Sequence, residues 1–70
     1  MTKKLFVGLL GQVPEGEVVE NHRLEFVVAE DVEDAKTKII SKWDDDHVHL
    51  DGIKELQEVD GYRLELKKMI

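Results

Sequence analysis

LFVGLL, residues 5 to 10, is the stretch of this 70-residue chain that decides the fold. All of its residues except Gly8 carry apolar side chains, so both faces of an extended segment would be apolar. A strand with two apolar faces is typical of the centre of a sheet, where other elements cover both of its sides. We therefore expect residues 5–10 to form the central strand.

A second strand is predicted over residues 22–29, HRLEFVVA, where polar and apolar residues alternate. One face would carry three apolar side chains, which we take as turned toward the core: Leu24, Phe26 and Val28. The opposite face begins charged and ends apolar: Arg23, Glu25, Val27 and Ala29. Because the segment 11–21 alone separates this strand from the first one, we expect the two to pair as a hairpin.

Residues 31–43, DVEDAKTKIISKW, contain the clearest helix signal of the chain. Asp31 is a residue type that caps helices, because its carboxylate accepts hydrogen bonds from the free backbone N–H groups of the first turn. Acidic residues come early and lysines late, which suits the helix dipole. Apolar residues recur at helical spacing along a single stripe, at positions 32, 35, 39 and 43. A helix of this kind covers one face of a sheet and not two.

The chain becomes extended again from His47, with a change of phase around Gly52. Leu50 and Ile53 are three positions apart, so a bulge or kink at Gly52 is needed to place both on one face.

A final hairpin is predicted around Asp60 and Gly61, and two registers compete for it. A two-residue turn pairs Glu58 with Arg63, whereas a three-residue loop over residues 59–61 pairs Leu56 with Leu64. We favour the three-residue loop because it groups four side chains on one face: Leu56, Tyr62, Leu64 and Leu66.

These elements predict a single α+β domain over residues 1–70, in the order ββαββ. We expect a four-stranded antiparallel sheet, ordered 2-1-3-4, with the helix packed on one face. The second face would still carry apolar residues: Phe6, Leu10, Val27 and Ala29. Since large apolar patches rarely stay exposed on monomers, we predict a homodimer that packs sheet on sheet or shares an edge. The alternative is that the segment 11–21 folds over this face.

The charge of the chain argues against nucleic acid and membranes as partners. Its 16 acidic and 10 basic residues give a formal net charge of −6, and no basic stripe with interleaved aromatic residues offsets it. The apolar run near the start is shorter than a secretory h-region or a membrane span, which need about 7–15 and about 20 residues. We therefore expect a cytoplasmic protein.

The densest chemistry lies in WDDDHVHLDG, which ends at Gly52. His47, His49 and Asp51 alternate, so a regular strand would place all three on one face. Imidazole and carboxylate groups are the ligands of hydrolytic metal sites, and His22 or one of the aspartates could complete such a set. The alternative is a solvent-facing polar strand edge after an acidic turn.

Glu20, His22 and Glu25 could form an acid–base group with His49 if the two segments meet in space. No nucleotide cofactor is predicted, because the glycines lack the spacing of a Rossmann or P-loop fingerprint. No metal site is predicted as a structural element, because the chain has no cysteine and all ligands would have to be histidine and carboxylate.

The order of motifs resembles a small bacterial family catalogued only as a domain of unknown function, with one or two copies per chain. The resemblance rests on six segments: LFVGLLG, PEG, ENHRLEFVVAED, a tryptophan that ends the helix, VHLDG and VDGYRLEL. It implies a fold and a self-associating module, but no activity. Gln12 departs from the family, which is expected to have a second glycine there, and His47 and the three aspartates lie outside the family pattern.

The same resemblance implies a polar pair ahead of the second strand, Glu20 and His22, and another at the start of the third, His49 and Asp51. We take these four as candidate ligand-binding residues. The leading hypothesis is a homodimeric binding or interaction module without a cofactor. The second hypothesis is a small-molecule enzyme or metal-binding protein that uses the same residues.

Overall fold

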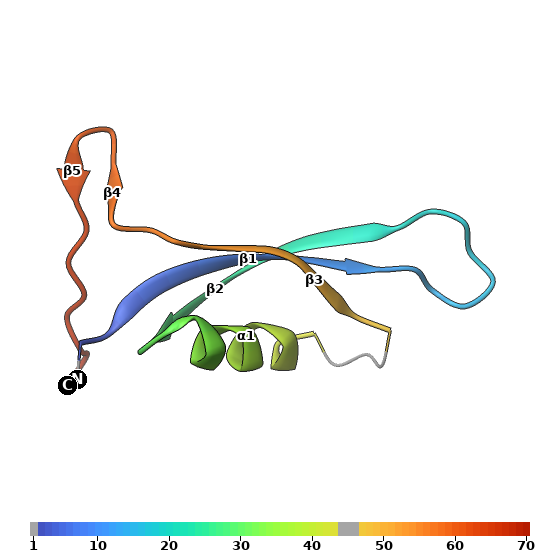
Figure 1. Cartoon of the computed structure of the whole chain (residues 1–70), viewed down its shortest axis with the longest axis horizontal. Coiled ribbons are helices and arrows are strands. Elements are labelled where there is room, and N and C mark those ends of the chain that lie inside the picture. The colour runs from blue at the N-terminus through green and yellow to red at the C-terminus, as the bar shows by residue number, and fades with distance from the viewer. Residues whose placement is uncertain (1, 44–46) are drawn as a thin grey trace.

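The computed structural model describes residues 2–43 and 47–70, and Figure 1 shows a helix lying against one side of a twisted sheet. The elements follow in the order β1 (Lys4–Gln12), β2 (Asn21–Ala29), α1 (Val32–Ser41), β3 (His49–Glu55), β4 (Glu58–Val59) and β5 (Tyr62–Arg63). The chain is therefore α+β, as predicted, and its paired strands are antiparallel. No helix within the described residues is long and apolar enough to cross a membrane.

The main sheet holds three strands in the order β2-β1-β3, so LFVGLL lies in the central strand as expected. The predicted four-stranded sheet is wrong, because the last hairpin forms a separate two-stranded sheet, β4–β5. The favoured register is also wrong, since Glu58 pairs with Arg63. Asp60 and Gly61 have φ values of 54° and 83°, which are the positive angles of a type I′ turn. The preference of Asp-Gly for this turn outweighs the grouping of leucines.

The helix covers the opposite face of the sheet from the one we expected. The buried core has six members: Phe6, Leu10, Val27, Ala29, Ala35 and Ile39. Leu24, Phe26 and Val28 stay 60%, 52% and 42% exposed. Small residues explain the choice of face, because a Cβ atom at Gly8 would lie only 2.7 Å from Cδ1 of Ile39. The helix thus packs closely where the central strand has no side chain.

We call the other side of the main sheet the open face. By strand alternation it carries Leu5, Val7 and Leu9 of β1 and Leu24, Phe26 and Val28 of β2. The segment between β1 and β2 does not cover it, because Val18 and Val19 are 96% and 67% exposed. The open face is therefore a mainly apolar surface that this connection leaves uncovered; beside Val28, the C-terminal residues Leu64 and Leu66 line a hollow with it.

β3 contains the irregularity that its sequence predicts. Leu9 of β1 pairs with Gly52 and Leu10 pairs with Leu50, so Asp51 is an extra residue in a β-bulge. The bulge lets Leu50 and Ile53 both pack against the core. It also leaves Asp51 pointing to the open face, where its carboxylate contacts both His22 and His49.

α1 begins at the predicted cap, where the Asp31 side chain accepts a hydrogen bond from a backbone N–H of the first turn at 2.8 Å. Near the other end, the ammonium groups of Lys38 and Lys42 donate to the backbone carbonyls of Val28 and Phe26 at 3.0 and 2.6 Å. These bonds tie the helix to the edge strand β2 and occupy carbonyl groups that an edge strand would otherwise leave unpaired.

Candidate functional site

Strand register brings two distant histidines to the same place. Gly11 of β1 pairs with His22 of β2 on one side and with His49 of β3 on the other. Directly paired residues point to the same face of a sheet, so two imidazoles flank a residue that has no side chain. Because the preceding Leu10 lies in the core, this row lies at one end of the open face.

Two carboxylates complete what we call the His–carboxylate cluster, formed by Glu20, His22, His49 and Asp51. Nε2 of His22 lies 2.9 Å from Oε1 of Glu20 and 3.5 Å from Oδ2 of Asp51. Nε2 of His49 lies 3.2 Å from the same Glu20 oxygen and 3.1 Å from Oδ1 of Asp51. Each imidazole therefore contacts both carboxylates.

Local structure explains how these groups converge. Asp51 is the bulge residue of β3, and bulges redirect side chains out of the regular alternation. Glu20 ends the connection to β2 and reaches back over β1. Gly11 provides the room: a Cβ atom there would lie 2.7 Å from Asp51 Oδ2 and from His49 Nε2, and closer still to Glu20 Oε1. The cluster exists in this form only because residue 11 is glycine.

The exposure and charge of the cluster suit a small cation. The side chains of Glu20 and Asp51 are 33% exposed, and those of His22 and His49 are 51% and 47% exposed, so solvent reaches all four. With both imidazoles neutral, the two carboxylates leave a net negative site. One ligand atom from each of Glu20, His49 and Asp51 lies within 4.8 Å of the others, a spacing that lets three donors surround one ion.

The four candidate residues named from the sequence all lie in the cluster. Two other candidates do not: His47 precedes β3, and Glu25 forms an ion pair with Arg23 at 2.8 Å on the helix side of the sheet. The three aspartates of the expected acidic turn lie outside the described residues. Sequence reasoning missed Gly11, although a glycine inside an apolar strand is itself a signal of close approach by other groups.

Residues 17–66 match the model of the family described as Domain of Unknown Function (DUF1543). No curated protein matches the chain. Among solved structures, the chain is similar to the crystal structure of a protein Il1583 from Idiomarina loihiensis, with 34% sequence identity and a TM-score of 0.72. The similarity covers 89% of this chain and 44% of that chain, so this chain spans less than half the length of its structural relative.

Proposed function

Since this chain belongs to the DUF1543 family, a domain of unknown function, we propose a function from its own residues: it is a small binding module that holds one divalent transition-metal ion. The observation that carries this proposal is the convergence of two imidazoles and two carboxylates over Gly11. Glu20, His49 and Asp51 are the proposed ligands, with His22 beside them as the fourth donor.

The donor types favour one class of ion. Calcium and magnesium select oxygen ligands, whereas imidazole nitrogen mixed with carboxylate oxygen suits zinc, manganese, cobalt or nickel. The proposed ion does not hold the fold together, so it differs from the structural metal site that the sequence argues against. The core lies on the other side of the sheet, and the cluster is half open to solvent. We therefore expect an exchangeable ion that the folded protein binds and releases.

The test is calorimetric titration of tag-free protein with Zn²⁺. We expect one ion per chain, and we expect His49→Ala to weaken binding by roughly tenfold or more because a direct ligand is lost. His47→Ala is the matched control, since it removes a histidine two positions away that is not in the cluster. An equal loss in both variants, or no binding by the parent protein, would contradict the proposal.

A second candidate function is hydrolysis of a small molecule at the same site. The position of His22 favours it: this residue contacts both carboxylates but lies outside the compact group of Glu20, His49 and Asp51. Three protein ligands with an open position are typical of catalytic zinc sites, and a neighbouring histidine is a suitable general base. Turnover of nitrophenyl esters by zinc-loaded protein, lost in His22→Ala with the zinc retained, would favour the enzyme. No turnover would favour binding alone.

A further inference from the structure

We propose that a second copy of this chain covers the open face, so that two sheets pack face to face. The face presents Leu24 and Phe26, which are 60% and 52% exposed, beside Val28 and Leu9 at 42% and 36%. No charged side chain of β1 or β2 interrupts this group, since the charged residues Arg23 and Glu25 belong to the helix side of β2. Lys54 of β3 pairs with Val7 and adds one positive charge beside this group. A surface that is mainly apolar can pack against itself, as a two-fold interface requires.

The exposed area is large enough for such an interface. A monomeric protein of 8.1 kDa exposes about 4,500 Å², whereas this chain exposes 5706 Å². The excess of about 1,200 Å² belongs to the whole elongated chain, the connection between β1 and β2 and the last hairpin included, and it is greater than the roughly 800 Å² that each partner buries in a standard stable interface.

A second copy of this chain suits the open face as its occupant. The face is mainly apolar, and the groups at its two ends differ in charge, so two copies related by a two-fold axis can complement each other.

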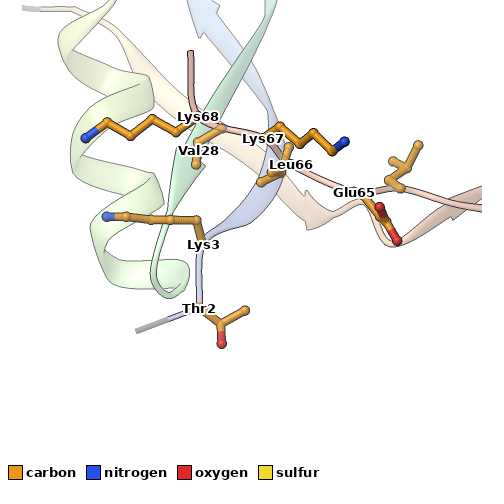
Figure 2. A pocket seen from close by; sticks show the side chains of 8 residues that line it. Thr2, Lys3, Val28, Glu65, Leu66, Lys67 and Lys68 are labelled. Carbon is orange, nitrogen blue, oxygen red and sulfur yellow. The ribbon is translucent and has the colours of Figure 1, made fainter. Parts of the chain in front are cut away.

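Charge at the two ends of the open face fixes the orientation. The His–carboxylate cluster lies at one end, around Gly11. At the other end, where Val28 pairs with Leu5, a hollow of about 870 Å³ has three lysines and one glutamate among its lining residues: Lys3, Lys67, Lys68 and Glu65. Figure 2 shows Lys3 and Lys68 extending to the same side of this hollow, and Lys67 to the opposite side.

We call this second region the lysine end. Glu30 partly neutralises it, because it pairs with Lys3 at 3.4 Å. A two-fold axis that lies in the interface and runs across the strands places the lysine end of one copy beside the cluster of the other. An axis along the strands would place like charges together, which is unfavourable.

The β4–β5 hairpin provides a second contact. Figure 1 shows it extending from the end of β3 on the side of the sheet away from α1. Within the described residues its strands pair only with each other, and Val59 and Tyr62 are 49% and 76% exposed. An isolated two-stranded hairpin is marginally stable in water. A second copy seated on the open face gives this hairpin a surface to pack on.

The test is light scattering coupled to size exclusion, in EDTA so that a metal cannot bridge two chains. One chain has a mass of 8.1 kDa. We expect the parent protein to have twice this mass in solution. Leu24→Asp should raise the dissociation constant of the dimer by at least about thirtyfold. Val18→Asp is the matched control, because it places the same charge at a more exposed valine outside the open face. Circular dichroism would show that each variant folds.

Each alternative outcome decides against part of the proposal. A parent protein that is monomeric at high micromolar concentration, or a Leu24→Asp variant that remains dimeric, overturns the covered face. Dissociation by Val18→Asp as well would show that the interface lies elsewhere. The double change Lys67→Gln and Lys68→Gln tests the orientation: it weakens the dimer if lysines face the cluster, because an attraction is lost, and it does not weaken the dimer if lysines face lysines.

Discussion

Gly11 lies where the ends of three polar side chains would meet a Cβ atom, and it is paired on both sides with histidines. A residue without a side chain at the middle of a sheet usually weakens it, because it has nothing to pack. Here the missing side chain lets groups from β2, β3 and the preceding connection share one small volume. Gly11 therefore makes room for the cluster, although it adds no side-chain packing to the strand.

We expect Gly11→Ala to weaken zinc binding by roughly tenfold while the fold survives, because the groups that must move are the ends of flexible side chains. Gly52→Ala is the matched control, since a Cβ atom there has nothing within 4 Å. Gly8→Ala should do the reverse of Gly11→Ala: it should cost about 1–3 kcal/mol of stability by crowding Ile39, with zinc affinity unchanged. Calorimetry and denaturant unfolding of the three variants separate these effects.

At this scale the sequence predicts the chemistry better than the geometry. The types and spacing of His49 and Asp51, and of Glu20 and His22, mark them as candidates. Their meeting depends on the two pairings of Gly11, which join residues from three separate strands. Periodicity reports which face a side chain takes but not which residue lies opposite, so the cluster could not be derived from the sequence.

Among the secondary-structure elements, α1 begins where the sequence predicts, directly after its cap Asp31, and ends at Ser41, two residues before the predicted Trp43. The signals are local: a capping aspartate, an acidic first turn and a single apolar stripe. The β4–β5 turn is also a local feature, yet its register differs from the predicted one, because turn geometry outweighs the grouping of apolar side chains. Local backbone preference decides a short exposed hairpin, since little burial is available to oppose it.

Asp34 gives α1 a dependence on pH. The backbone N–H of Glu30 donates to its carboxylate at 3.2 Å, and Lys38 lies 3.2 Å away, so both hold the pKa of Asp34 below its ordinary value. Because the pKa is lower in the folded state, the stabilisation is present above the unfolded pKa and is lost as the pH falls through the folded one.

Asp34→Asn should therefore lower the melting temperature at neutral pH by no more than a few degrees, because solvent screens an exposed pair. The difference from the parent protein should shrink as the pH falls from neutral to below the unfolded pKa of about 3.9, because the parent carboxyl then becomes protonated. Thermal unfolding followed by circular dichroism across this pH range measures it. Asp60→Asn makes the same chemical change in the β4–β5 turn, and an equal closing difference there would contradict the assignment to Asp34.

As a whole, the molecule is more extended than its length requires. A compact domain of 70 residues has a radius of gyration of about 11 Å, and this chain has 14.1 Å.

The central strand and the single covering helix follow from the sequence, but the covered face does not. The sequence favours the face with Leu24, Phe26 and Val28 as the core face. The helix packs on the opposite face, where the small residues Gly8 and Ala29 allow a close approach.

If two copies share the open face, thermal stability must depend on protein concentration. We expect the melting temperature of the metal-free protein to rise by about 5 °C for each tenfold increase in concentration, because unfolding then also separates two chains. Leu24→Asp should remove this dependence, and Val18→Asp should retain it. Scanning calorimetry at several concentrations provides the measurement. A melting temperature that does not change with concentration in the parent protein would argue for a monomer.

The bulge at Asp51 also sets how the length of this strand can vary in related sequences. Deleting one residue between His49 and Ile53 would restore regular alternation, but it would turn either the cluster residues or Ile53 to the wrong side of the sheet. Insertions and deletions should therefore be rare here and common in residues 13–19, where Val13, Val18 and Val19 are exposed. A homologue that is one residue shorter in β3 is best examined first for loss of the histidine or the aspartate.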